Sequence, residues 1–212
     1  MFKFGSKDFV PDTALAMRFS IKAAVGRFFS RKYRQPKNTL LHLGCGSNIM
    51  VDFENLDFYR NRFWKTDFVG HDLRYPLPYE DKVFEGAFSE HVIEHLYPSH
   101  AINLLREVQR VLKPGAIFRI CVPDLKKYIA FYNGDRSDSK FAKFSSGCEA
   151  IWNLTQNWGH VSCWDAQMLG NQLLDAGFKS IKECQYLVGH DPRLLRDLEH
   201  RRWESLYVEA VA

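Results

Sequence analysis

The stretch Thr39-Leu-Leu-His-Leu-Gly-Cys-Gly46 decides the fold of this chain. Residues 39–43 form a short apolar run, and Gly44 and Gly46 end it at once, which predicts a buried strand followed by a tight turn. In open α/β sheets, small residues in such a turn let a nucleotide-type ligand approach the backbone at the carboxyl end of the strand. The stretch therefore predicts a fold class and the edge of the sheet where a ligand binds.

Strands and helices are expected to alternate along the rest of the chain. Short apolar runs bounded by turn residues predict further strands at residues 54–57, 82–89, 116–122, 178–188 and 205–210. Apolar residues at helical spacing predict two helices, one capped by Ser99 and one capped by Ser162. Two prolines within residues 72–81 predict a loop there. This alternation predicts helices on both faces of a mostly parallel sheet.

Charge is distributed unevenly along the 212 residues. Residues 1–37 hold nine Lys or Arg against Asp8 and Asp12, a net charge of +7, and the remainder of the chain carries −3. We expect a basic helical N-terminal extension over residues 1–37 and one α/β domain over residues 38–212. The extension is expected to pack on the domain, with at most peripheral membrane contact and no sequence-specific recognition of nucleic acid.

The distribution of cysteines and apolar residues predicts a cytoplasmic protein. The five cysteines are odd in number and scattered without a CxxC pair, which argues against a disulfide framework and against a thiolate zinc site. No apolar stretch is long enough to span a bilayer, and residues 1–10 lack the apolar core of a secretory signal. Reduced thiols in the cytoplasm are the simplest interpretation.

The turn after the first strand differs from a dinucleotide fingerprint. Such a fingerprint needs a third glycine at the position of Ile49, so a nicotinamide cofactor is disfavoured. A nucleoside-type ligand without a pyrophosphate remains, and an acidic residue at the end of the next strand would hold its ribose hydroxyls. Asp57 is in position, with Asp52 and Glu54 open as alternatives.

Five segments occur in a fixed order between about residues 39 and 188. They are Leu41-His-Leu-Gly-Cys-Gly46, then Asp72 with Leu77-Pro78 and Asp81, then Val83 to Ser89 with Glu94-His95-Leu96, then Leu105 to Val108 with Arg110 to Gly115, and finally Asp175-Ala-Gly-Phe178. In this order they resemble the class I S-adenosylmethionine-dependent methyltransferases, in particular the methyltransferase type-eleven group. The resemblance implies a doubly wound, mostly parallel seven-stranded sheet of Rossmann-like methyltransferase type.

The resemblance also implies a cofactor and its site. It implies an enzyme that uses S-adenosylmethionine, with cofactor residues at the positions that match the motifs. They are Gly44, Cys45 and Gly46 facing the methionine part, Asp57 at the ribose hydroxyls, Asp72 with Leu73 at the adenine, and Ser89 with Glu90 beside the sulfonium. The chain departs from the family pattern at Asn48, where a third glycine is common. Only ten residues separate Gly46 from Asp57, so the first helix must be short or absent.

The segment His91-Val-Ile-Glu94-His95 matches the H-x-x-E-H pattern of inverted zinc peptidases. A metal site needs a third ligand and a helix long enough to hold the histidine pair, yet a strand ends just before the segment and Pro98 follows just after. We therefore expect a loop at the ligand edge and no metal ligands. A zinc hydrolase that uses this motif is the less favoured alternative, and a non-catalytic cofactor-binding module is another.

The acceptor of the methyl group is not specified by any motif. Methyl transfer mainly requires alignment of acceptor and methyl group, but a hydroxyl acceptor also needs a base that removes its proton. The candidate catalytic residues are His160, His91 and Glu94. Trp152 to Trp164 mix aromatic and amide side chains, so a saccharide or another small hydroxylated molecule is the preferred acceptor.

Overall fold

The computed structural model describes residues 34–57 and 68–212. The predicted basic helical extension over residues 1–37 lies almost entirely outside the described residues. Its helical character and the domain boundary at residue 38 therefore stay predictions.

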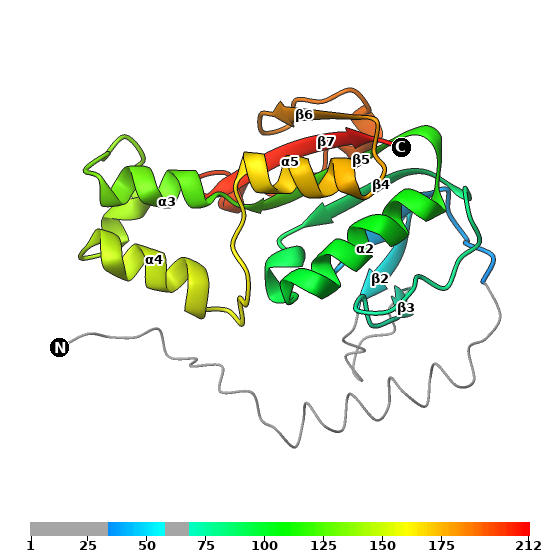
Figure 1. Cartoon of the computed structure of the whole chain (residues 1–212), viewed down its shortest axis with the longest axis horizontal. Coiled ribbons are helices and arrows are strands. Elements are labelled where there is room, and N and C mark those ends of the chain that lie inside the picture. Colours follow the sequence, from blue (N-terminus) through cyan, green and yellow to red (C-terminus); the bar gives the residue numbers. More distant parts are fainter. Residues whose placement is uncertain (1–33, 58–67) are drawn as a thin grey trace, which may run out of the picture.

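Seven strands form one sheet in the order β3-β2-β1-β4-β5-β7-β6 (Figure 1). Neighbouring strands are parallel from β3 to β5, whereas β7 runs antiparallel to both β5 and β6. The strands are β1 (Leu40–Leu43), β2 (Phe53–Asp57), β3 (Phe68–Gly70), β4 (Phe84–Glu90), β5 (Leu112–Pro123), β6 (Ser180–Cys184) and β7 (Ser205–Val211). The predicted mostly parallel, Rossmann-like sheet is confirmed. The short strand β3 was not predicted, and β6 is shorter than the predicted 178–188.

The described α-helices are α2 (Pro98–Val111), α3 (Leu125–Tyr132), α4 (Gly147–Gln156) and α5 (Ala166–Asp175). Helix α2 begins one residue before Ser99, because Pro98 suits the first helical position, where no backbone N–H is needed. The cap of α5 is Asp165, which accepts a hydrogen bond of 2.7 Å from the Met168 N–H. The predictions that Ser99 and Ser162 cap these helices were therefore wrong.

The turn after β1 leads to β2 without an intervening helix. Residues 44–52, all of them described, form turns and bends, which confirms that the usual first helix is absent. The predicted loop over residues 72–81 is also confirmed.

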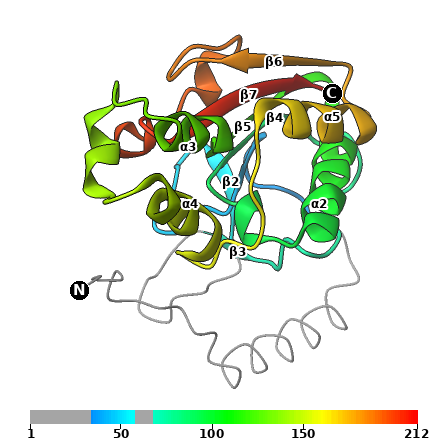
Figure 2. The same cartoon turned by 60° about the vertical axis from the view of Figure 1, so that its left-hand side comes forward.

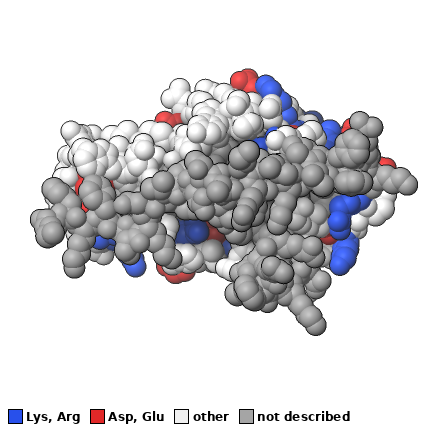
Figure 3. Space-filling model, turned by 90° about the horizontal axis from the view of Figure 1, so that it is seen from below, with Lys and Arg blue, Asp and Glu red and all other residues white. Residues whose placement is uncertain are grey.

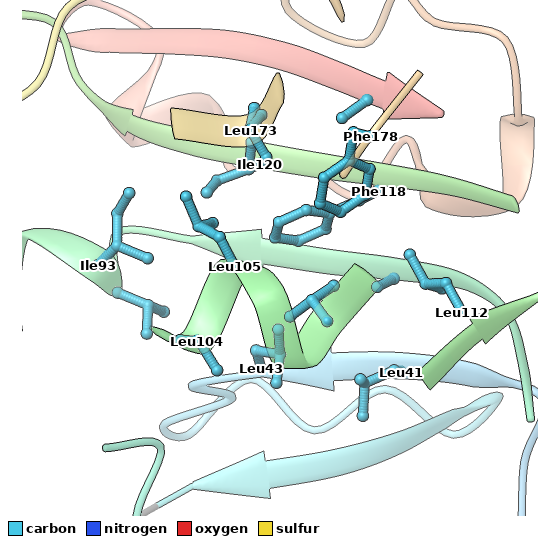
Figure 4. Close-up of a cluster of buried hydrophobic side chains, with 14 of the residues drawn as sticks. Leu41, Leu43, Ile93, Leu104, Leu105, Leu112, Phe118, Ile120, Leu173 and Phe178 are labelled. Atoms are coloured by element: carbon cyan, nitrogen blue, oxygen red, sulfur yellow. The ribbon is translucent and has the colours of Figure 1, made fainter. Parts of the chain in front are cut away.

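The main core lies between one face of the sheet and helices α2 and α5, which lie side by side in Figures 1 and 2. Figure 4 shows how the layers meet: Leu105 of α2 and Leu173 of α5 lie close to Phe118 and Ile120 of β5. The apolar positions of α2 that the helical spacing predicted are all buried. Packing of this apolar face, more than helix propensity, holds α2 on the sheet.

The other face of β5 and β7 packs against the segment of residues 185–198, which includes the short 3₁₀-helix η3 (Pro192–Leu194). Arg119 of β5 is completely buried there, and its Nε donates to Oδ1 of Asp197 at 2.7 Å. Arg119 also pairs with Glu209 of β7 at 3.3 Å. This ion network, which sequence analysis did not find, fastens the segment to the sheet.

Residues 125–163, called the insertion below, lie between β5 and α5. Helices α3 and α4 pack on each other around an aromatic cluster that includes Tyr128 and Phe141, and they lie beyond the carboxyl ends of β4 and β5 (Figures 1 and 2). The two ends of the insertion meet: Asp124 and Trp164 form a β-bridge, and the Leu125 N–H donates to the Trp164 carbonyl at 2.9 Å. Neither helix was predicted.

None of the helices within the described residues is long and apolar enough to cross a membrane. On the face in Figure 3, the described part of the surface carries Lys and Arg side chains in small separate groups near Asp and Glu.

Candidate active site

The predicted cofactor residues gather at one edge of the sheet. Strands β1, β2, β3 and β4 are adjacent and parallel, so their carboxyl ends at Leu43, Asp57, Gly70 and Glu90 face the same way. Open α/β sheets bind their ligands at this edge, outside the carboxyl ends of the strands.

The turn after β1 is tied to the end of β2. Gly44 and Gly46 have backbone φ angles of 63° and 52°, in the left-handed region that favours glycine. The Gly46 N–H donates to Oδ2 of Asp57 at 2.8 Å, and the Cys45 N–H donates to the Leu56 carbonyl at 3.0 Å. Burial raises the pKa of the Cys45 thiol to about 12, so this cysteine is an inert part of the turn.

The two glycines have different surroundings. A Cβ on Gly44 would lie 2.3 Å from Cγ2 of Val92, so Gly44 lets the segment after β4 pack against the turn. A Cβ on Gly46 would meet no heavy atom of the described residues within 4 Å. Gly46 therefore borders open space at the ligand edge, whereas the missing side chain of Gly44 serves packing.

Among the three acidic residues left open for the ribose, Asp57 alone lies at the strand end beside the glycine turn. Glu54 is buried, and its two carboxylate oxygens accept hydrogen bonds from Tyr79 Oη and the Lys37 N–H. Asp52 lies in the exposed turn before β2.

Asp72 and Leu73 follow β3 at the same edge. Leu73 is buried in the main core. Asp72 accepts hydrogen bonds from the side chain and the backbone N–H of Arg74. Burial opposes ionisation of Asp72, but the Arg74 contacts outweigh it and hold the pKa of this carboxyl below its usual value.

Ser89 and Glu90 end β4 with different surroundings. The Ser89 hydroxyl is buried and has no hydrogen-bond partner among the described residues. Glu90 accepts a hydrogen bond of 3.0 Å from the Leu198 N–H, and burial raises the pKa of its carboxyl.

A cluster of one carboxyl and three imidazoles follows β4. The 3₁₀-helix η1 (Ile93–His95) carries Glu94, whose Oε1 lies 3.5 Å from His91 Nδ1 and 4.0 Å from both His95 Nε2 and His160 Nε2. Residues 160–162 reach this position because the N–H groups of Val161 and Ser162 both donate to the Glu94 carbonyl, at 2.8 and 3.1 Å. The predicted catalytic residues His91, Glu94 and His160 therefore lie together, and His95 joins them.

Two hydrogen bonds fix the imidazole tautomers. His160 Nδ1 donates to the Leu154 carbonyl at 2.6 Å, which leaves Nε2 of the neutral ring as an acceptor. The Ser205 hydroxyl donates to the Arg201 carbonyl, so His91 Nε2 must donate to Ser205 Oγ and its Nδ1 is left as an acceptor facing Glu94.

Burial determines the charge of this cluster. Desolvation raises the pKa of Glu94 to about 8 and lowers that of His95 to about 4, with nearby His160 lowering the latter further. Desolvation also lowers the pKa values of His91 and His160. At neutral pH the imidazoles are therefore uncharged, and a neutral imidazole can accept a proton.

The chain matches the family of the methyltransferase domain over residues 47–120, which includes β2, β4 and α2. This match and the strand order of the sheet agree with the motifs at the ligand edge. The chain carries a methyltransferase domain that uses S-adenosylmethionine. The acceptor is not specified by the match, and no curated protein matches this methyltransferase.

Solved structures share the fold of this methyltransferase. A possible histamine N-methyltransferase from Thermotoga maritima is 15% identical, with a TM-score of 0.55 over 93% of this chain and 91% of that one. A putative methyltransferase solved in complex with the Trm112 methyltransferase activator of Haloferax volcanii is 17% identical, with a TM-score of 0.51 over 97% and 96%. At these identities the likeness shows the fold alone.

The ligand edge of the methyltransferase fits S-adenosylmethionine. Gly46 leaves open space beside the turn, and Asp57 lies at the neighbouring strand end. At the end of β4, the Ser89 hydroxyl has no hydrogen-bond partner within residues 34–57 and 68–212. When bound, the cofactor supplies an electrophilic methyl group on a sulfonium.

The insertion, which contributes His160 to the cluster around Glu94, also carries two tryptophans. Trp152 and Trp158 are 53% and 69% exposed, whereas Trp164 is buried in the main core. Within the predicted aromatic stretch, Trp164 therefore serves packing, whereas Trp152 and Trp158 are exposed. A separate cavity of about 570 Å³ lies between α3 and the 3₁₀-helix η4 (Glu199–Arg201), and no predicted site residue lines it.

Proposed function

We propose that the methyltransferase acts on a hydroxyl of a sugar or of another small hydroxylated metabolite, with His160 as the base. The observation that carries this proposal is the unprotonated Nε2 of His160, which lies 4.0 Å from Glu94 just beyond the end of β4. A hydroxyl must lose its proton as it attacks the methyl group, whereas an amine can attack as the neutral form. A neutral imidazole held in one tautomer favours the hydroxyl.

The exposed aromatic and amide side chains of the insertion support a small, polar and flat acceptor. Trp152 and Trp158 offer apolar faces, and Asn153, Gln156 and Asn157 offer hydrogen-bonding groups. Flat rings with a few polar groups suit the apolar faces and hydroxyls of sugars.

For the cofactor we propose the assignment that the motifs imply, except at Gly44, which the motifs place against the methionine part. Asp57 accepts hydrogen bonds from the ribose hydroxyls, Asp72 and the Leu73 backbone contact the adenine, and Ser89 and Glu90 lie beside the sulfonium. In the turn, Gly46 and the Cys45 backbone face the methionine part, and Gly44 supports this turn from behind. The close approach of Val92 to Gly44 favours this packing role for Gly44.

The test is a panel of hydroxylated and amine acceptors, scored by formation of S-adenosylhomocysteine. On the acceptor found, His160→Ala is expected to lower kcat by about 10²–10⁴-fold with the cofactor Kd unchanged, the range for a lost general base. His200→Ala, an exposed histidine of η4, is the matched control and keeps the wild-type rate. Turnover of an amine acceptor alone, or an undiminished rate in His160→Ala, would contradict the proposal.

A further inference from the structure

Glu94 is a buried carboxyl without a hydrogen-bond partner in the described part of the chain. Its side chain is 1% exposed, and neither Oε1 nor Oε2 is hydrogen-bonded to a described residue. An unsatisfied buried polar group costs about 1–3 kcal/mol, and more when it is charged. Such a group in a folded protein calls for a partner, such as an ion, that the polypeptide alone does not supply.

Imidazole nitrogens surround this carboxyl. Oε1 of Glu94 and the ring nitrogens of His95 and His160 all lie within 4.8 Å of one another. Two ligands of a tetrahedral zinc ion lie about 3.4 Å apart, since each is about 2.1 Å from the metal. Glu94 lies 4.0 Å from each of the two histidine nitrogens, so small rotamer shifts would bring all three atoms to bonding distance.

The surroundings prepare His160 as a ligand. Its Nδ1 donates to the Leu154 carbonyl, which turns the lone pair of Nε2 towards Glu94. Histidines that bind metals almost always donate their other N–H to a carbonyl, a carboxylate or water, which fixes the ring orientation. The backbone bonds from Val161 and Ser162 to the Glu94 carbonyl hold the two segments together.

We propose that Glu94, His95 and His160 bind a divalent transition-metal ion such as zinc. Two imidazoles and one carboxylate are the donor set of catalytic zinc sites and of non-haem iron sites, whereas Mg²⁺ and Ca²⁺ prefer oxygen ligands. From the sequence we expected no metal, because the H-x-x-E-H segment lacked a third ligand. His160 provides that ligand from the insertion.

The site is open on one side. His95 is 39% exposed at its side chain, whereas Glu94 and His160 are 1% and 8% exposed. An ion can therefore enter past His95 and keep open coordination positions on that side. The inference rests on the proposed hydroxyl acceptor, but with the ion bound His160 Nε2 would be a ligand and not the base. The ion would take over that role by binding the acceptor hydroxyl and lowering its pKa, as bound zinc does for water, so that the proton can pass to solvent.

Calorimetry with zinc alone tests the site in the full chain after treatment with a chelator. We expect about one zinc per chain, and at least about 100-fold weaker binding in His95→Ala and His160→Ala, since each removes a ligand. The exposed His95 side chain can be removed without disturbing the core, so loss of binding in that variant does not reflect misfolding. His200→Ala is expected to bind zinc like the wild type.

Absence of zinc binding in the wild type, or unchanged binding in both ligand variants, would refute the metal site. Magnesium in millimolar excess is expected not to displace zinc, and displacement would refute the assigned metal class. Zinc binding without turnover of any hydroxyl acceptor would leave the site in place and contradict the proposed acceptor. Turnover of a hydroxyl acceptor by a chain that binds no zinc would refute the metal site and leave the proposed acceptor in place.

Discussion

The backbone N–H of Gly46 donates a hydrogen bond of 2.8 Å to Oδ2 of Asp57. This bond joins the turn after β1 to the end of β2, so the two parts of the proposed cofactor site are positioned together. A carboxylate has two oxygens with about four acceptor sites in all, so the bond from Gly46 is compatible with hydrogen bonds from ribose hydroxyls.

Replacing Asp57 with alanine is expected to weaken binding of S-adenosylhomocysteine by about 10–100-fold, the loss of one or two hydrogen bonds to a charged group. Titration calorimetry measures the change. Asp52→Ala is the control, because this exposed carboxylate lies in the preceding turn. Equal effects of the two substitutions would contradict the assignment of Asp57.

The two glycines of the turn should respond differently to alanine. Gly44→Ala is expected to cost about 1–3 kcal/mol of unfolding free energy, because its Cβ meets Val92 and its φ is positive. Gly46→Ala has room in the fold and carries only the backbone penalty of about 1–2 kcal/mol, but places a methyl group at the ligand edge. Urea unfolding and cofactor titration separate the two effects.

The double substitution Gly44→Ala with Val92→Ala provides a further check. It removes the contact partner of the new methyl group, so Gly44→Ala should cost less stability in the Val92→Ala background than in the wild type, with Val92→Ala alone as the reference. An equal cost in both backgrounds would show that the backbone conformation alone determines the cost.

The buried ion network around Arg119 of β5 is expected to contribute most of the stability with which residues 185–198 are held on the sheet. Asp197→Ala leaves the completely buried Arg119 without its main partner, and removal of one member of a buried pair costs about 3–5 kcal/mol. Urea unfolding gives the value. The pair of Arg193 and Asp191, in which the arginine side chain is 48% exposed, is the control, and Arg193→Ala should cost less than about 1 kcal/mol. Similar losses in both variants would contradict this distinction.

The ion pair of Asp72 and Arg74 predicts a pH dependence. Asp72 has a lower pKa in the folded chain than its usual 3.8, so its contribution is present above that value and is lost as pH falls through the folded pKa. In Arg74→Gln, the difference in unfolding free energy between pH 6 and pH 3 should therefore shrink. An unchanged difference, measured by urea unfolding at both values, would contradict the inferred direction.

The sequence predicted the parts of the fold and site that depend on local pattern. The turn after β1 and the strand ends at Asp57 and Ser89 are visible because apolar runs stop there at glycine or acidic residues. Helix α3 is only eight residues long, too short for its periodicity to be distinguished from a buried strand. Tyr128 and Phe131 of this helix pack in the aromatic cluster with Phe141 and Phe144, against Ala150 and Leu154 of α4.

The meeting of Glu94 and His160 could not be predicted from the sequence. It depends on the path of the whole insertion and on backbone bonds from Val161 and Ser162, and no spacing rule encodes either. The H-x-x-E-H pattern did mark His91, Glu94 and His95 as possible metal ligands. What it lacked was the partner from the distant segment, without which a paired histidine motif does not indicate a metal.

The bridge between Asp124 and Trp164 has an evolutionary consequence. Because the chain leaves the sheet and returns to it at one point, the residues between can change in length without moving β5 or α5. Doubling the length of such a closed loop costs only about 0.6 kcal/mol of closure entropy. A related enzyme can therefore exchange this whole segment for another and acquire a different substrate while keeping its methyl donor.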